Sequence, residues 1–132
     1  MSGPHVGLVL VSHSEKLAEG VAELAAQLGG DEVPIKAAGG TDDGGLGTSI
    51  EKVERAIREA DRGAGVLLLA DLGSAVLTIK ALLDDDAPAS RVQLADAPLV
   101  EGAIAAVVTA SAGADLATVL ASAEEARSYR KL

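Results

Sequence analysis

His13 and Asp71 are the residues of this chain whose type and position best suit chemistry. His13 follows the apolar run 5–11, and Asp71 lies near the end of the apolar run 65–74. If these runs are neighbouring parallel strands, their carboxyl ends meet and the carboxylate can accept the Nδ1 proton of the histidine. That bond would fix the tautomer and leave Nε2 free as a nucleophile, because an imidazole with a pKa of about 6.5 is largely neutral near pH 7.

Two segments rich in glycine and hydroxyl groups are expected beside His13. The loop 39–49 reads GGTDDGGLGTS, and Gly73 and Ser74 follow Asp71. Both segments lead into predicted helices, whose first backbone N–H groups have no partner within the helix and can hold an anion. Because both lie at the same edge of the sheet as His13, together they favour a phosphate site. Its expected lining is Gly39, Gly40, Thr41, Gly47, Thr48, Gly73 and Ser74.

Each of these residues also has a structural explanation. A histidine at a strand end is more often a surface or capping residue than a catalyst, and hydroxyl groups commonly cap helices. Asp71 alone can be an ordinary loop acid, and Asp42 and Asp43 are expected in a solvated turn. His5 falls at the opposite edge of the sheet and is assigned no role. A functional site is favoured over these structural explanations because three strand ends carry reactive or glycine-rich residues together.

Composition and charge limit the classes of protein. The 132 residues suit one domain, expected to span 1–132, and 48% are hydrophobic although Tyr129 is the only aromatic residue. The net charge of −9 argues against binding to nucleic acid or an anionic membrane and favours a partner with a basic face. With no cysteine and two histidines, no metal site is predicted. No apolar stretch approaches the ~20 residues that span a bilayer, so we expect a cytoplasmic protein.

Hydrophobic periodicity predicts strands that alternate with helices. This alternation implies right-handed crossovers and a mainly parallel sheet covered on both faces, which is an α/β fold. Thr48 and Glu51 have the spacing of a capping box, Pro34 favours a sheet edge for the second strand, and Ala87-Pro88 marks a break. The expected strands are 5–11, 31–38, 65–74 and 92–96, and the expected helices are 17–28, one beyond the loop from about 50, 74–83, 99–112 and 114–127.

Several ligand-binding classes lack their motifs. No G-x-G-x-x-G follows a strand and no G-x-x-x-x-G-K-[ST] is present, so direct nucleotide binding is not supported. A receiver domain would need an acidic cluster after its first strand, where this chain has Ser-His-Ser. A flavin site would use aromatic stacking, which a chain with one aromatic residue does not supply.

Four segments in order resemble one known family: GLVLVSHSEKLAEGV, AAGGTDDGGLGTS, LLLADLGSAV and LADAPLVEGA. They are similar to the phosphotransferase subunit, subunit M, of phosphoenolpyruvate-dependent dihydroxyacetone kinases, whose first domain resembles the IIA domain of mannose-type sugar phosphotransferase systems. The resemblance covers nearly the whole chain and places the family's phosphorylated histidine at His13 and its orienting aspartate at Asp71. It implies a four-stranded parallel sheet in the order 2-1-3-4, with helices on both faces, and a homodimer.

The resemblance also implies a function in glycerol metabolism. In this family a phosphohistidine formed on Nε2 passes its phosphoryl group to ADP on a nucleotide-binding subunit, and the resulting ATP phosphorylates dihydroxyacetone on a third subunit. The chain would then be a phosphoryl relay that binds no cofactor itself, with ADP or ATP held by the partner subunit. Because some relatives continue into a phosphocarrier domain and this chain does not, we expect a separate histidine phosphocarrier protein as the donor.

The turn after Asp71 separates two branches of the resemblance. Sugar-transport IIA domains usually have an extra residue and a paired glycine there, whereas here Asp71-Leu72 is followed at once by Gly73 and Ser74. This favours the dihydroxyacetone branch. The alternatives are a IIA component of a mannose-type sugar system and a non-catalytic phosphorylation sensor, and a sensor would not support turnover of dihydroxyacetone.

Overall fold

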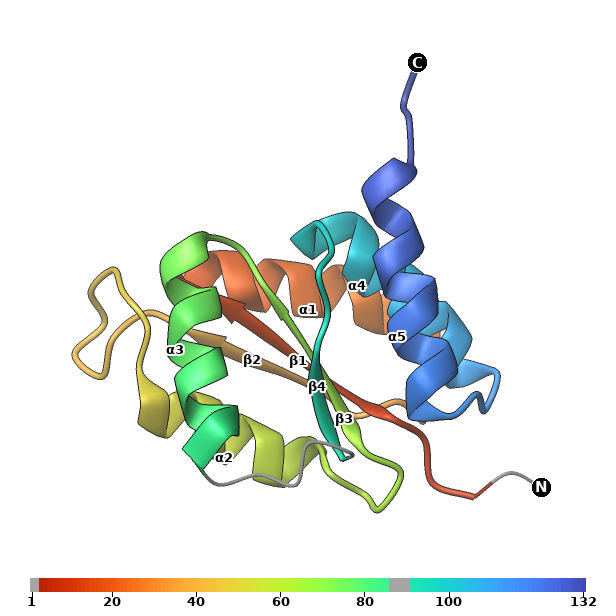
Figure 1. Ribbon diagram of the computed structural model, residues 1–132, viewed down its shortest axis with the longest axis horizontal. Helices are drawn as coiled ribbons and strands as arrows, with labels where there is room; N and C mark the ends of the chain where they lie inside the picture. Colours follow the sequence, from red (N-terminus) through yellow and green to blue (C-terminus); the bar gives the residue numbers. More distant parts are fainter. Residues whose placement is uncertain (1–2, 86–90) are drawn as a thin grey trace.

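Parallel strands form a single sheet at the centre of the molecule (Figure 1). The computed structural model describes residues 3–85 and 91–132. The sheet has four strands in the order β2-β1-β3-β4, and all three pairings are parallel. The expected order and α/β class are therefore confirmed. The strands are β1 (Gly7–Ser12), β2 (Ile35–Gly39), β3 (Val66–Ala70) and β4 (Val92–Leu94).

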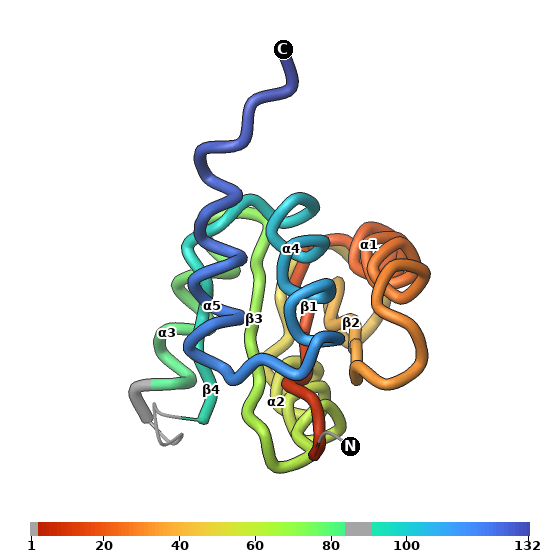
Figure 2. Tube along the Cα trace, turned by 90° about the vertical axis from the view of Figure 1, so that its right-hand side faces the viewer, coloured from red at the N-terminus to blue at the C-terminus, as the bar shows by residue number. Residues whose placement is uncertain are grey.

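Helices cover both faces of this sheet, as the crossover argument requires. One face carries α1, α4 and α5, which lie side by side in Figure 2, and the other carries α2 and α3. None of the helices in the described ranges is long and apolar enough to cross a membrane. Their bounds are α1 (Glu15–Gly29), α2 (Ile50–Ala60), α3 (Gly73–Asp85), α4 (Leu99–Ser111) and α5 (Leu116–Glu125), with a short 3₁₀-helix at Ala126–Ser128.

The side chains of β1 explain why the strand is apolar along its length. Leu8 and Leu10 point into the core beneath α1, α4 and α5, whereas Val9 and Val11 point into the core beneath α2 and α3. Successive side chains of a strand face opposite sides of the sheet, so a strand with helices on both faces has no solvent-facing positions. Alanines of the covering helices complete both cores, because small side chains let these helices pack close to the sheet without aromatic residues to fill the space between.

The register of β1 and β3 fixes where the candidate residues meet. Val11 pairs with Ala70, and the Asp71 N–H donates to the Val11 carbonyl at 3.1 Å. His13 and Asp71 therefore leave adjacent strands at the same edge of the sheet. On the other side of β1, Ser12 pairs with Gly39 of β2, which brings the loop 39–49 to the same edge.

Several predicted boundaries were wrong. The second strand begins at Ile35, although the Pro34 carbonyl still accepts a bond from the N–H of Leu8 at 2.8 Å. The third strand ends at Ala70, because the Asp-Leu-Gly-Ser sequence after it forms the turn into α3. The last predicted helix is divided between α5 and the 3₁₀-helix. The break expected at Ala87-Pro88 lies outside the described residues.

The cap of α2 is also different from the prediction. Ser49, rather than Thr48, is the N-cap residue, and its hydroxyl accepts a bond from the Lys52 N–H at 3.2 Å. Because the third helical position is then a lysine, the expected capping box does not form. Glu51 instead lies 3.4 Å from the Ser49 hydroxyl through a carboxylate oxygen. Adjacent Thr and Ser are both good caps, so spacing alone does not separate them.

Candidate active site

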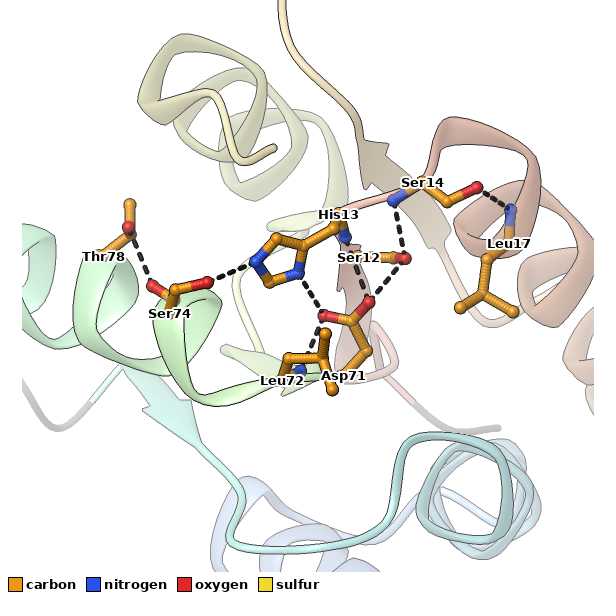
Figure 3. A network of polar contacts seen from close by, with 8 residues as sticks. All are labelled: Ser12, His13, Ser14, Leu17, Asp71, Leu72, Ser74 and Thr78. Carbon is orange, nitrogen blue, oxygen red and sulfur yellow. Dashed lines mark hydrogen bonds and ion pairs between the residues drawn. The ribbon is translucent and has the colours of Figure 1, made fainter. Parts of the chain in front are cut away.

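His13 and Asp71 are joined by two hydrogen bonds at the carboxyl edge of the sheet (Figure 3). The ring Nδ1 lies 3.0 Å from Oδ1, and the backbone N–H of His13 donates to Oδ2 at 3.0 Å. The His13 side chain is 23% exposed and that of Asp71 is 11% exposed. One carboxylate thus holds both the ring and the backbone of the histidine, while the ring stays accessible.

The Asp71 carboxylate has two further donors. The Ser12 hydroxyl donates to Oδ2 at 2.8 Å, and the Leu72 N–H donates to Oδ1 at 2.7 Å. Burial acts to raise the pKa of Asp71, but the bonds from His13, Ser12 and Leu72 outweigh it, so that this pKa lies below its ordinary value of 3.8. The group is therefore ionised at neutral pH and can only accept hydrogen bonds.

An ionised acceptor determines the tautomer of the neutral His13 ring. Nδ1 must carry the proton that it shares with Oδ1, which leaves the lone pair on Nε2. Nε2 contacts the hydroxyl of Ser74 in the first turn of α3. Because Nε2 has no proton, the hydroxyl donates to it. The nucleophilic nitrogen consequently faces the N-terminal end of a helix.

The start of α3 offers donors at this position. Within the described residues, the backbone N–H groups of Gly73 and Ser74 have no hydrogen-bond partner. Free N–H groups and the positive end of the helix dipole both favour an anion. Seven residues were expected to line a phosphate site. Of these, Gly73 and Ser74 are on the side of the ring where Nε2 lies.

The loop 39–49 holds His13 from the other side. The Gly40 N–H donates to the Ser12 carbonyl at 3.1 Å, and the Gly47 N–H donates to the His13 carbonyl at 3.0 Å. The Thr41 N–H is likewise taken by the Gly45 carbonyl at 3.0 Å. These three N–H groups support the chain around His13 and are not free donors for an anion.

Gly39, Gly40 and Thr48 complete the expected set. A Cβ on Gly39 would lie 2.5 Å from the Ser14 carbonyl oxygen, so this glycine lets β2 pass close to α1. Gly40 has a φ of +75°, in the left-handed region that favours glycine. Thr48 differs from both, because its hydroxyl is buried without a hydrogen-bond partner in the described part of the chain.

His5 lies at the opposite edge of the sheet, as expected. It is buried, its Nδ1 lies 2.7 Å from the Ala110 carbonyl oxygen, and its Nε2 lies 3.5 Å from Glu32. It ties the start of the chain to the end of α4. Across residues 3–85 and 91–132, no group of three or more His, Cys, Asp or Glu residues is placed to hold a metal ion.

Comparison with known proteins decides the family. The family model described as PTS system fructose IIA component matches residues 7–120. The chain belongs to this family. Curated members of the family include the "PEP-dependent dihydroxyacetone kinase, phosphoryl donor subunit DhaM" of Escherichia coli, which is 46% identical over 120 residues. The family that the four sequence segments indicate is thereby confirmed.

The relatives differ in length. The match covers 87% of this chain but 25% of the Escherichia coli DhaM, so the chain spans about a quarter of that relative. The "PEP-dependent dihydroxyacetone kinase 2, phosphoryl donor subunit DhaM" of Listeria innocua serovar 6a is 38% identical over 105 residues, which are 78% of this chain and 84% of the relative. The chain therefore also belongs with the DhaM subunits.

Solved structures support the same fold. A crystal structure of a protein of unknown function is 38% identical, with a TM-score of 0.85 and coverage of 97% of this chain and 98% of that chain. A sigma-54 interaction domain protein from Enterococcus faecalis has a TM-score of 0.71 at 19% identity, with coverage of 96% and 93%. The second likeness concerns the fold alone.

Replacement of Asp71 by asparagine should destabilise this IIA domain. An amide presents one oxygen and one NH₂ group, and the NH₂ group would face donors that now bond to the carboxylate. We expect Asp71→Asn to lower the free energy of unfolding at pH 7 by about 1–3 kcal/mol, measured by urea denaturation.

The pH dependence of this difference has a defined sign. Because the pKa of Asp71 is lowered by folding, its stabilisation is present above the unfolded pKa and is lost as the pH falls through the folded pKa. The difference in the free energy of unfolding between wild type and Asp71→Asn should therefore become smaller below about pH 4. Asp31→Asn, at an exposed position, serves as the control. Equal stability of wild type and Asp71→Asn at pH 7 would contradict the prediction.

Proposed function

We propose that this chain is the phosphoryl relay subunit of a phosphoenolpyruvate-dependent dihydroxyacetone kinase. His13 accepts a phosphoryl group on Nε2 from a histidine phosphocarrier protein and passes it to ADP on a nucleotide-binding subunit. The observation that carries this proposal is the His13–Asp71 pair, whose geometry occupies Nδ1 and leaves Nε2 as the nucleophile. The DhaM relatives, which are named as phosphoryl donor subunits, support it.

Each transfer exchanges one bond to phosphorus for another. The lone pair of Nε2 attacks the phosphorus of the carrier's phosphohistidine, and the N–P bond of the carrier breaks with its electron pair returning to the carrier's imidazole. The His13 ring then carries a positive charge, which the ionised Asp71 stabilises through the Nδ1 proton. In the second step an oxygen of the ADP β-phosphate attacks the same phosphorus, and the Nε2–P bond breaks.

The phosphoryl oxygens need donors while they reside on His13. We assign this role to the free N–H groups of Gly73 and Ser74 and to the Ser74 hydroxyl, which must leave Nε2 before the attack. The unpartnered hydroxyl of Thr48 is a further donor on the side of the loop. Gly39, Gly40, Thr41 and Gly47 contribute by shaping and supporting this loop, since their close packing or N–H bonds serve the chain around His13.

A sugar-transport role is the second candidate, because the matching family model is described as a fructose IIA component. The chemistry at His13 would be the same and only the acceptor would differ. A third reading, a non-catalytic phosphorylation sensor, would accept phosphate without supporting turnover. The identity of the acceptor therefore separates the three.

A reconstituted assay tests donor and acceptor together. The chain is incubated with phosphoenolpyruvate, the two general phosphotransferase proteins, the ADP-binding and dihydroxyacetone-binding subunits, and dihydroxyacetone. We expect product formation that requires the chain, with an acid-labile and alkali-stable label on it, as a phosphoramidate should give. His13→Gln should abolish the label and the product, while His5→Gln, at the opposite edge of the sheet, should retain both. A labelled chain that yields no dihydroxyacetone phosphate would reject the relay proposal.

Exposed leucines near His13 favour docking of protein partners. Leu46 is 83% exposed in the loop 39–49, and Leu72 and Leu77 are 61% and 70% exposed in the turn before α3 and in its first turns. A cavity of about 520 Å³ opens beside Asp71 and is lined in part by Leu72 and Val76. Because the chain as a whole carries a net charge of −9, the fitting partner has apolar side chains surrounded by basic residues.

A comparison of a protein donor with a small-molecule donor separates the effect of docking from the effect on phosphoryl transfer. Leu77→Asp should raise the KM for the phosphocarrier about tenfold, while phosphorylation by the small donor phosphoramidate stays unchanged, because that donor needs no protein surface. Leu132→Asp, an exposed terminal position, is the matched control. The KM for the carrier should also rise with ionic strength. Loss of both reactions in a folded Leu77→Asp protein would contradict a docking role.

We also propose that the chain forms a homodimer through α1 and α4. Leu24 and Leu28 of α1 and Val100 and Val108 of α4 are exposed on neighbouring helices of one face (Figure 2). Two copies that each carry −9 charges repel one another, so they associate best through exposed apolar side chains.

Light scattering measures this association directly. The wild-type chain should have the mass of a dimer, and a Leu24→Glu, Val108→Glu double variant should have the mass of a monomer with an unchanged circular dichroism spectrum. Leu132→Glu should remain dimeric. A monomeric wild type at high micromolar concentration would reject the proposed interface.

A further inference from the structure

Ser12 is a buried polar residue at the end of an apolar strand. Its side chain is fully buried, whereas every other residue of β1 is Gly, Leu or Val. The hydroxyl oxygen lies 2.8 Å from Oδ2 of Asp71 and 3.0 Å from the backbone nitrogen of Ser14 (Figure 3). Sequence reasoning treats Ser12 only as part of the turn, and the transfer steps above do not use it.

The direction of both hydrogen bonds of Ser12 is determined. The Ser14 N–H can only donate, so the Ser12 oxygen accepts from it. The ionised carboxylate of Asp71 can only accept, so the Ser12 hydroxyl proton points to Oδ2. Within the described residues, all the donors to Asp71 come from Ser12, His13 and Leu72. The Ser12 hydroxyl is the one side-chain donor among them that does not take part in the transfer chemistry.

The two bonds connect Asp71 to the start of α1. Ser14 is the N-cap residue of that helix, where the helix dipole has its positive end. The resulting chain runs from the Ser14 N–H through the Ser12 hydroxyl to Asp71 and then to the Nδ1 proton of His13. The bonds from Ser14 to Ser12 and from Ser12 to Asp71 run in the same direction and polarise one another, so the Ser14 N–H strengthens the Ser12 hydroxyl as a donor. The bonds from Ser12 and from the His13 ring meet at the carboxylate from two sides and hold its orientation.

We propose that Ser12 is a positioning residue for phosphoryl transfer, whose hydroxyl fixes the orientation of the Asp71 carboxylate and thereby keeps the His13 proton on Nδ1. The effect on transfer rate rests on the proposed function of His13, but the effect on the tautomer does not. Without this hydroxyl, Oδ2 keeps only the bond from the His13 N–H, and the part-buried Ser14 N–H loses its acceptor. The carboxylate is then freer to rotate away from the ring.

The Ser12→Ala variant removes this donor with little change in volume. Nitrogen NMR of the histidine side chains should show His13 of the wild type mainly as the Nδ1–H tautomer and His13 of Ser12→Ala as a mixture with the Nε2–H tautomer. The pH midpoint of the Asp71 carboxyl carbon signal should move upward in the variant. Phosphorylation by the phosphocarrier should slow about tenfold, as for the loss of one hydrogen bond to a charged group.

Three further variants separate positioning from packing. Ser12→Thr restores the hydroxyl and should restore the tautomer and rate. Ser12→Cys fills the same space with a weaker donor, and should resemble Ser12→Ala; it also replaces Ser12→Ala if that variant does not fold. Ser128→Ala removes an exposed hydroxyl far along the chain and should behave as wild type. Unfolding in urea shows how much stability each change costs.

The readouts decide between this inference and its competitors. A folded Ser12→Ala protein with an unchanged His13 tautomer and an unchanged Asp71 midpoint would overturn the positioning role, whatever its rate. A changed tautomer and midpoint would support it, even if the wild type took no phosphoryl group from the carrier. That last result would reject the proposed function alone, because the NMR measurements need neither donor nor acceptor.

Discussion

The buried carboxylate of Asp71 is the group on which the site depends. Removing a charge from water costs free energy unless hydrogen bonds replace the lost hydration. Here the donors come from β1, from the residue that follows it and from the turn into α3. These segments are far apart in sequence, so the charge is tolerated only when both strands have paired in the native register. Asp71 therefore connects the pairing of β1 and β3 to the orientation of the His13 ring.

The two apolar cores protect that register. Leu8 and Leu10 of β1 belong to one core, and Val9 and Val11 belong to the other, so a slip of one residue would exchange the two sets between cores of different shape. The same slip would remove Ser12 and His13 from Asp71 together. Packing of aliphatic side chains in the sheet thus sets the geometry of the polar site at its edge.

Sequence patterns were most informative where composition changes abruptly. The apolar runs beside His13 and Asp71 indicated two strands, although the second was predicted to continue to residue 74 and ends at Ala70, and a parallel sheet then required the two carboxyl ends to be close. The strand order was available only from the family resemblance, because spacing does not order parallel strands. The bonds of Gly40 and Gly47 to β1 and the N-cap choice of Ser49 depend on backbone geometry that no local pattern encodes. The contacts of Ser12 depend on the register itself, and its proposed role, like the roles of His13 and Asp71 in transfer, stays a prediction.

The bond from the Gly47 N–H to the His13 carbonyl connects the loop 39–49 directly to the backbone of the histidine. Leu46, next to Gly47, is the most exposed large hydrophobic residue of this loop and is available to a partner protein. Binding of a partner protein at Leu46 is therefore coupled, through this bond, to the backbone that carries the imidazole. By thermodynamic reciprocity, a change in charge on that imidazole must alter how firmly the partner protein is held. Under the proposed relay function, the loop would therefore let a bound protein distinguish phosphorylated from unphosphorylated His13.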